Sequence, residues 1–143
     1  GTLPDDMTRD EARSKLGIAA DQKVFLFLGQ IRGYKGIDEL IHAFNGLNSK
    51  DGDCRLVMAG KLLGISQQDI ERKLSGCQNI LFRPGYVPDE EMQVYLKSAD
   101  VMVLPYRKVL TSGSVFLAMS FGLPVICPRA GLLSRPPRAW STE

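Results

Sequence analysis

The stretch KVFLFLGQIRGYKGIDELIHAF, residues 23–44, decides the fold because it joins a strand to a helix through a glycine-hinged turn. Residues 24–28 form an unbroken apolar run, which is typical of a strand buried on both faces of a sheet. From Ile37 onward the apolar residues recur at helical spacing, so this helix should bury one face and expose the other. The predicted buried face consists of Ile37, Leu40, Ile41, Phe44 and Leu47. The turn between the two elements carries Arg32 and Lys35.

The same alternation of strand and helix runs along most of the chain. Further apolar runs predict strands at residues 54–60, 79–85, 101–105 and 124–128. Helical patterns lie at residues 8–17, 66–76, 88–99 and 112–122. The first two begin at a capping Thr8 or Ser66 and end at a glycine, and the third has acids in its first turn and Lys97 in its last. Strands without polar alternation, separated by helices, indicate a doubly wound, Rossmann-like α/β fold: a parallel sheet with helices on both faces.

We therefore expect one α/β domain over residues 8–131. The remaining residues, 132–143, contain Pro136 and Pro137, an isolated Trp140 and no periodicity. That composition predicts an irregular or disordered tail, so the C-terminal end of the fold should be truncated or irregular.

Composition excludes several classes of function. The 143 residues are 44% hydrophobic and 24% charged, with a formal net charge of +2. So small a net charge argues against nucleic acid as a partner, and any anion site must be local. The three cysteines are widely spaced and form no CxxC motif, which argues against a disulfide framework and a zinc site. No apolar run is long enough to span a membrane and no signal peptide is visible, so we expect a cytoplasmic protein without direct membrane insertion.

Positively charged residues gather where the predicted strands end. Four of the five loops that follow strands carry a lysine or an arginine, and Arg83 lies near the end of the third strand. The loop cations are Arg32, Lys35, Lys61, Arg107, Lys108 and Arg129. Ligands of an open α/β sheet bind outside the carboxyl ends of the strands. This rim of cations therefore favours a ligand with clustered negative charge, such as a diphosphate.

The segment TSGS, residues 111–114, lies where the fifth predicted helix begins. The start of a helix offers unpaired N–H groups and the positive end of the helix dipole, both of which attract anions. Gly113 would let a phosphate approach the backbone, and the hydroxyl groups of Thr111, Ser112 and Ser114 would add donors. A plainer interpretation is that these residues only cap the helix. The cations of the first loop make the two interpretations about equal.

Other cofactor-binding patterns are absent from the sequence. Gly29, Gly33 and Gly36 do not form the GxGxxG fingerprint, and there is no Walker A lysine. No Asp-x-Asp motif follows a predicted strand. Redox cofactors and P-loop hydrolysis are therefore disfavoured, and we expect neither a metal nor a cofactor.

Four segments in collinear order resemble the C-terminal half of GT-B-type glycosyltransferases, the family of "glycosyl transferases group 1". They are FLGQIRGYKGIDELIHAF, LVMAGK, FRPGYVPDEEMQVYLKSADVMVLPYR and SGSVFLAMSFGLPVICPRAG, and the resemblance as a whole extends over roughly residues 8–131. The resemblance implies a domain that binds a nucleotide diphosphate sugar, from an enzyme of hexosyltransferase type that builds a polysaccharide or glycolipid. It also implies an N-terminal acceptor-binding domain in the same full-length enzyme.

The resemblance assigns a role to each loop. In the family, an arginine and a lysine of the first loop contact the donor diphosphate; Lys35 matches the lysine, whereas Gln30 occupies the arginine position beside Gly29. Arg32 would then have to substitute for that arginine. The segment Gly85, Tyr86 and Val87 corresponds to the stretch that holds the base and ribose. Thr111, Ser112, Gly113 and Ser114 correspond to the loop for diphosphate and sugar, and Lys61 is an additional candidate for the same site.

The sequence departs from the family at two carboxylates. The two glutamates that the family carries around the fifth helix fall on Val109 and Leu117. Their loss puts the sugar and ribose contacts in doubt and leaves the stereochemical course, retaining or inverting, open. It also supports an alternative: a degenerate, non-catalytic module for nucleotide binding or protein interaction. A regulatory domain of flavodoxin type is disfavoured, because the strand ends carry cations rather than acids.

The resemblance leads to three expectations for the whole enzyme. It should move a sugar from a nucleotide diphosphate sugar to a glycan or glycolipid acceptor, and it should work in the cytoplasm, peripheral to the inner face of the membrane. The chain alone should be inactive because the acceptor domain is missing.

The remaining polar residues are expected to have no part in the chemistry. His42 should be exposed on a helix, and Asp100 should close a turn. The acidic residues Asp89, Glu90 and Glu91 should offset a helix dipole.

Overall fold

The computed structural model describes residues 4–33, 35–51, 53–105, 113–128 and 140–142. The helices are α1 (Arg9–Leu16), α2 (Lys35–Asp51), α3 (Gln67–Leu74), α4 (Asp89–Ser98) and α5 (Gly113–Ser120). The long strands are β1 (Lys23–Leu28), β3 (Cys54–Gly60) and β5 (Ile80–Pro84). The shorter strands are β2 (Ile31–Arg32), β4 (Leu62–Leu63), β6 (Val101–Val103), β7 (Val125–Pro128) and β8 (Trp140–Thr142).

The main sheet has six described strands in the order β5-β3-β1-β6-β7-β8. The first five strands of that order run parallel to their neighbours, and β8 pairs antiparallel with β7. Because β3 and β6 flank β1 on opposite sides, the chain reverses its direction of winding at β1. That point lies where ligands bind in doubly wound folds, outside the carboxyl ends of the strands.

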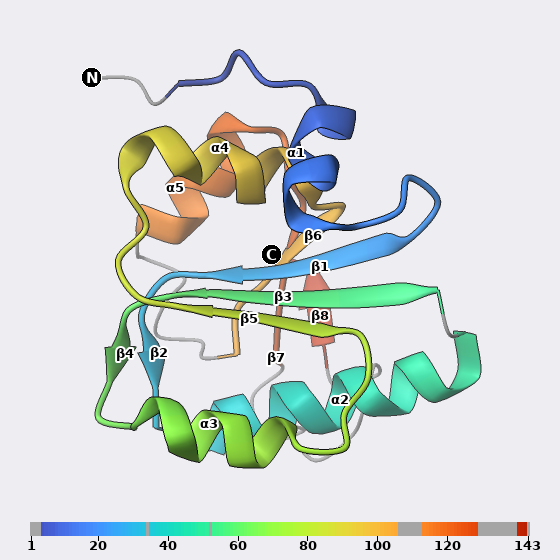
Figure 1. Ribbon diagram of the computed structural model, residues 1–143, viewed down its shortest axis with the longest axis vertical. Helices are drawn as coiled ribbons and strands as arrows, with labels where there is room; N and C mark the ends of the chain where they lie inside the picture. Colours follow the sequence, from blue (N-terminus) through green and yellow to red (C-terminus); the bar gives the residue numbers. More distant parts are fainter. Residues whose placement is uncertain (1–3, 34, 52, 106–112, 129–139, 143) are drawn as a thin grey trace.

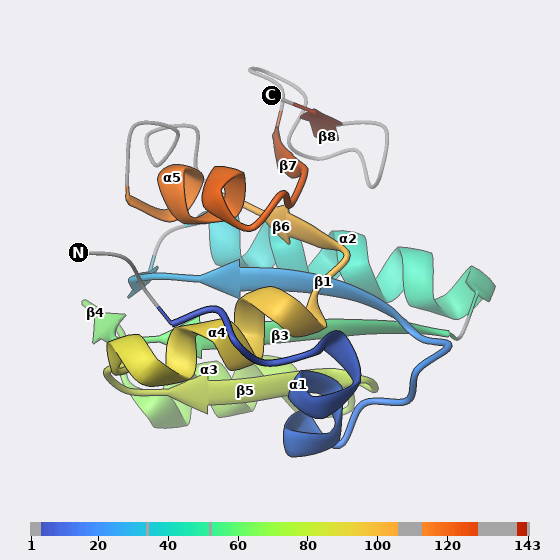
Figure 2. The same ribbon diagram turned by 90° about the horizontal axis from the view of Figure 1, so that it is seen from above.

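The sheet is covered on both faces. Helices α1, α4 and α5 lie on one face and α2 and α3 on the other (Figures 1 and 2). The first face buries alternate residues of the strands, such as Leu26 and Val57, against Leu96 of α4. The second buries the intervening residues, such as Phe27 and Met58. Successive residues of each strand thus face opposite sides of the sheet, and both sides are apolar, as the unbroken apolar runs in the sequence predict. The doubly wound α/β fold is confirmed.

The predicted helix boundaries are confirmed where caps define them. Thr8 accepts a hydrogen bond from the N–H of Glu11, and the Glu11 side chain accepts one from the N–H of Thr8, so α1 begins with a capping box. At its other end Gly17 adopts a left-handed conformation, with φ of 70°. Ser66 caps α3 in the same way through the N–H of Asp69. The predicted apolar face of α2, including Ile37 and Phe44, is buried.

Two features of the structure were not predicted from the sequence. Within the predicted tail, residues 132–143, the described residues Trp140, Ser141 and Thr142 form strand β8, which pairs with β7. On α5, Met119 is 68% exposed and Phe116 is 66% exposed. The strands β2 and β4 form a separate two-stranded parallel sheet that the sequence did not reveal, because two residues are too few for a periodic signal.

Candidate functional site

The two-stranded sheet lies at the carboxyl ends of β1 and β3. The chain leaves β1 at Leu28 and enters β2 after two residues, while β4 follows β3 after one residue. Ile31 pairs with Leu62 and Arg32 pairs with Leu63, and the N–H of Ile31 donates to the carbonyl of Lys61 at 2.8 Å. The first two loops of the predicted rim are therefore one structural unit.

Glycines allow this unit to close. A Cβ atom on Gly60 would lie 1.7 Å from the carbonyl oxygen of Gly29, and Gly60 has φ of 142°. A Cβ atom on Gly33 would lie 2.8 Å from the carbonyl oxygen of Gly64. Both contacts are too short for any side chain, so the two loops can approach this closely only with glycine at these positions.

Arg32 and Gln30 meet on the outside of this unit. The guanidinium of Arg32 donates a hydrogen bond to the Oε1 atom of Gln30 at 2.7 Å. Ile31, which lies between them, is fully buried in the core. The guanidinium of Arg32 therefore lies beside the side chain of Gln30, and its role in place of the family's arginine stays a prediction. Lys35 begins α2, but its side chain and Tyr34 lie outside the described residues.

The predicted base loop follows β5. The N–H of Gly85 donates to the carbonyl of Gly60 at 2.8 Å, which ties this loop to the glycine-closed unit. Tyr86 is 78% exposed, whereas Val87 is 8% exposed and packs in the core of the α1, α4 and α5 face. Only the backbone of Val87 is thus available to a ligand, while Tyr86 presents a whole aromatic ring.

The fifth helix begins at Gly113, and a Cβ atom there would meet nothing within 4 Å. The open space beside Gly113 suits the close approach of a ligand. Thr111, Ser112 and Val109 lie outside the described residues, as does the side chain of Ser114. Leu117, at a glutamate position of the family pattern, packs against the core.

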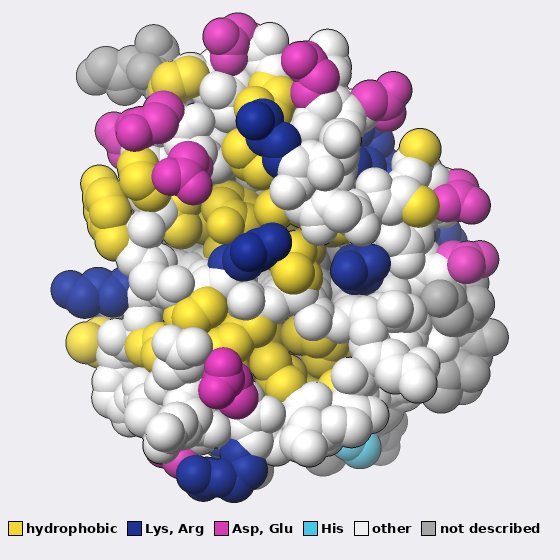
Figure 3. All heavy atoms as spheres, viewed as in Figure 1, with side chains coloured by type: hydrophobic (Ala, Val, Ile, Leu, Met, Phe, Trp, Pro, Cys, Tyr) yellow, Lys and Arg dark blue, Asp and Glu magenta, His cyan; other side chains and the backbone are white. Residues whose placement is uncertain are grey.

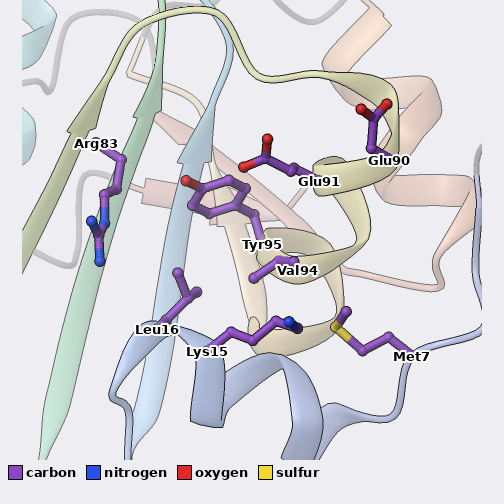
Figure 4. Close-up of a pocket in the computed structure, with 8 residues that line it drawn as sticks. All are labelled: Met7, Lys15, Leu16, Arg83, Glu90, Glu91, Val94 and Tyr95. Carbon is purple, nitrogen blue, oxygen red and sulfur yellow. The ribbon is translucent and has the colours of Figure 1, made fainter.

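A hollow of about 530 Å³ lies elsewhere, between α1, α4 and the edge strand β5 (Figure 4). None of the sequence-predicted donor-site residues lines it; its walls are Met7, Lys15, Leu16, Arg83, Glu90, Glu91, Val94 and Tyr95. Burial raises the pKa of Tyr95, partly offset by the charge of Arg83. Figure 3 shows hydrophobic side chains on this face, with acidic ones over α1 and α4. Its two cations and two carboxylates are exposed, so we assign the hollow no ligand.

A charged network that the sequence did not reveal lies at the opposite end of the sheet. Arg13 is 1% exposed and donates to the carbonyl oxygens of Ser98, Ala19, Ala20 and Gln22. It also donates to Oδ2 of Asp100 at 3.0 Å.

Asp100 in turn accepts hydrogen bonds from Arg9 and from the N–H of Val24. Burial acts to raise the pKa of Asp100, but these hydrogen bonds and the charges of Arg9 and Arg13 outweigh it and lower the pKa. The turn predicted at Asp100 is thus one part of a larger network that joins α1, β1 and β6.

The remaining polar residues behave as plain surface groups. His42 is exposed on α2, and Asp89, Glu90 and Glu91 form the first turn of α4, as predicted. Over the described residues, no three His, Cys, Asp or Glu side chains come together as a metal site. Within the same residues, no helix combines the length and the apolar character needed to cross a membrane.

Known proteins resemble this chain over most of its length. The family model described as "Glycosyl transferases group 1" matches residues 8–135. A D-inositol 3-phosphate glycosyltransferase of Arthrobacter sp. (strain FB24) is 30% identical over 131 residues, which are 89% of this chain and 31% of that protein.

Two solved structures share the fold. WaaG, a glycosyltransferase involved in lipopolysaccharide biosynthesis, is 29% identical, with a TM-score of 0.64 over 82% of this chain and 31% of that one. The C-terminal domain of the group 1 protein LpcC from Francisella tularensis is 22% identical, with a TM-score of 0.63 over 90% of this chain and 68% of that one. The chain spans about 31% of the length of its curated relative and matches the C-terminal part of such enzymes.

Proposed function

The chain belongs to the glycosyl transferases group 1 family, and from this premise we propose that it is the part of a glycosyltransferase that binds the nucleotide diphosphate sugar donor. The observation that carries the proposal is the position of Arg32 on the glycine-closed unit at the carboxyl ends of β1 and β3. A guanidinium is always charged and presents several N–H donors, so it suits a diphosphate.

The diphosphate would lie between the first loop and the start of α5. Arg32 and Lys35 would meet it from one side, with Gly29 and Gln30 beneath it. The segment Thr111, Ser112, Gly113 and Ser114 would offer hydroxyl groups and the N–H donors of the helix terminus from the other. Charge-assisted hydrogen bonds contribute roughly 1.5–3 kcal/mol each, so loss of one cation should be measurable.

The base and ribose would lie over the loop of Gly85, Tyr86 and Val87. Tyr86 is exposed and could stack on any base, since every base has an aromatic face. Backbone groups and a stacking ring distinguish bases poorly, so we expect less than about a hundredfold preference among UDP, GDP and ADP.

The whole enzyme would transfer the sugar to a glycan or glycolipid acceptor, with an N-terminal domain that supplies the acceptor site. The chain covers only about 31% of its curated relative, which leaves room for such a domain. We expect no sugar transfer from this chain alone, and we expect donor binding to need no metal, because cations would neutralise the diphosphate. The full-length enzyme would work in the cytoplasm at the inner face of the membrane.

A second candidate function is a non-catalytic module that binds nucleotide or protein. Leu117 favours it, because this side chain packs against the apolar core where the family pattern has a glutamate for the ribose. Such a module would still bind the diphosphate but would lack the contact to the ribose. The two candidates differ in whether the intact enzyme transfers sugar, and they share the diphosphate site.

Calorimetry tests the shared site. We expect the unmodified chain to bind at least one of UDP, GDP and ADP more tightly than the corresponding nucleoside. The Arg32→Ala variant should bind that diphosphate about 10- to 100-fold more weakly and the nucleoside as before, because only the diphosphate carries the group that Arg32 would hold.

A matched control is Lys23→Ala, which removes an exposed cation from the amino end of the same sheet and should leave both affinities unchanged. Equal losses for diphosphate and nucleoside in Arg32→Ala would contradict the proposal, since they would indicate a damaged loop. Failure of all three diphosphates to bind the unmodified chain would also contradict it.

A further inference from the structure

We propose that Lys61 is a second phosphate-binding residue, whose charge meets that of Arg32 on the outer face of the two-stranded sheet. This inference rests on the proposed function and extends the donor site from the first loop to the second. Its basis is the ladder between β2 and β4, which sets the two loops side by side.

The register of the ladder places Lys61 beside Gln30. Because Ile31 pairs with Leu62, the residues before them, Gln30 and Lys61, are neighbours across the two strands. Ile31 is fully buried and Leu62 packs against the same core. Side chains alternate between the two faces of a strand, so Gln30 and Lys61 belong to the opposite, outer face. The exposure of Gln30 and Lys61 agrees with this.

Arg32 brings its charge to the same place. It also belongs to the outer face, and its guanidinium lies on the amide of Gln30 at 2.7 Å. Gln30 is thus contacted by one cation and flanked by another. Two positive charges on adjacent strands repel each other, and an anion bound between them would remove that repulsion.

The backbone of Lys61 is held on both sides, so the point from which its side chain starts is fixed beside the first loop. Gly60 lies against the backbone of Gly29, and the carbonyl of Lys61 accepts the N–H of Ile31. Within the part of the chain that the structure describes, Lys61 has no carboxylate partner. Lys73, by contrast, is neutralised by Asp38 at 2.7 Å.

The chemistry of the ligand follows from this pair. A nucleoside diphosphate has two adjacent phosphates, so Arg32 and Lys61 can each hold one of them. A nucleoside monophosphate has a single phosphate and would gain little from the second cation. Inorganic pyrophosphate has the two phosphates without the base, so it reports on this surface alone.

Titration calorimetry on the full chain tests the inference. UDP, GDP, ADP, the corresponding monophosphates and pyrophosphate are each titrated into the unmodified chain and into Lys61→Ala. We expect Lys61→Ala to weaken the diphosphates and pyrophosphate about tenfold, and the monophosphates about threefold or less. Lys61→Arg should keep most of the affinity because it keeps the charge. Lys23→Ala, at the amino end of the sheet, should change nothing.

The outcomes separate this inference from the proposed function. If Arg32→Ala weakens the diphosphates and Lys61→Ala does not, the proposed function stands and the role of Lys61 is wrong. If Lys61→Arg loses as much as Lys61→Ala, the positive charge is not what binds and the inference is also wrong. If the unmodified chain binds none of the three diphosphates, both fail. Equal melting temperatures of the variants exclude misfolding as the cause of a loss.

Discussion

The positively charged side chains at the two ends of the sheet differ in their burial and in their partners. At the amino end, Arg13 is buried and its donors are used by four carbonyl groups and the carboxylate of Asp100. At the carboxyl end, the guanidinium of Arg32 donates a hydrogen bond to the amide of Gln30, and within the described residues Lys61 has no carboxylate partner. The comparison teaches that a buried cation whose donors are used within the chain stabilises the fold, whereas an exposed cation such as Lys61 remains available to a ligand.

The difference has an energetic reason. A buried guanidinium without partners would cost several kcal/mol, so Arg13 can be buried only because every part of it is hydrogen-bonded. An exposed lysine costs little because water solvates it, and its attraction for an anion grows when a ligand excludes that water. Substitutions at the two ends should therefore affect different quantities: the free energy of unfolding at the amino end and ligand affinity at the carboxyl end.

The largest effect on stability is expected from Arg13→Ala. This change leaves Asp100 and four carbonyl groups without their buried donor, so the free energy of unfolding should fall by about 3–5 kcal/mol. Urea denaturation measures the loss. The control is Arg72→Ala, which breaks an exposed pair with Asp69 on α3 and should cost about 0.5 kcal/mol or less.

A loss below about 1 kcal/mol for Arg13→Ala would break the comparison, because the network would then be no more than a surface feature. Unchanged stability of Arg13→Ala together with weaker nucleotide binding would contradict the assignment of stability to the amino end and affinity to the carboxyl end. Either result would show that the hydrogen bonds and ion pair of Arg13 are not what holds α1 to the sheet.

The next effect is expected at Gly60, where the carboxyl end does contribute to stability. Gly60→Ala places a methyl group against the carbonyl oxygen of Gly29, so the two loops must separate or the backbone must strain. We expect a loss of about 2 kcal/mol or more in the free energy of unfolding. Diphosphate affinity should fall as well, because Arg32 and Lys61 move apart.

Gly17→Ala is the matched control. Gly17 also has a positive φ, of 70°, but a Cβ atom there would meet nothing within 4 Å. It should therefore lose only about 1 kcal/mol from the backbone conformation and leave affinity unchanged. If Gly60→Ala behaved like Gly17→Ala in both measurements, the close contact between the loops would not be what positions the two cations.

The features that the sequence predicted are those that repeat. The apolar run at residues 24–28 and the helical spacing after Ile37 each extend over several residues, so their strand and helix could be assigned with their faces. The caps at Thr8 and Gly17 follow local rules and were also predictable. The fold class needed only these elements in order, and the family resemblance needed in addition the residues of the four collinear segments.

The features that the sequence did not reveal depend on contacts across the fold. Arg13 joins residues that are 85 and 87 positions away, and nothing local marks it as different from Arg9. The pairing of β2 with β4 involves two residues from each loop, too few to show a period. The candidate site was therefore predictable as a set of loops and cations, but the neighbour relation of Gln30 and Lys61 required the structure.

The smallest effect is expected in the dependence of stability on pH. Burial acts to raise the folded pKa of Asp100, but the hydrogen bonds from Arg9 and from the N–H of Val24 and the charges of Arg9 and Arg13 outweigh it, so this pKa is lowered. A carboxyl group with a lowered folded pKa contributes stability above its unfolded pKa, about 3.9 for aspartate, and loses that contribution as pH falls through the folded value. Stability should therefore drop below about pH 4. Asp100→Asn should flatten that drop, and Asp69→Asn, in an exposed pair, should leave it unchanged. Because the Asp100 side chain is 37% exposed, solvent screens the interaction and the change should stay near or below about 1 kcal/mol. The result that would contradict this is an equal fall in the free energy of unfolding below pH 4 in Asp100→Asn and in the unmodified chain. Arg13 would then be held by the backbone carbonyls alone, and the Asp100 carboxylate would contribute nothing to the difference between the two ends of the sheet.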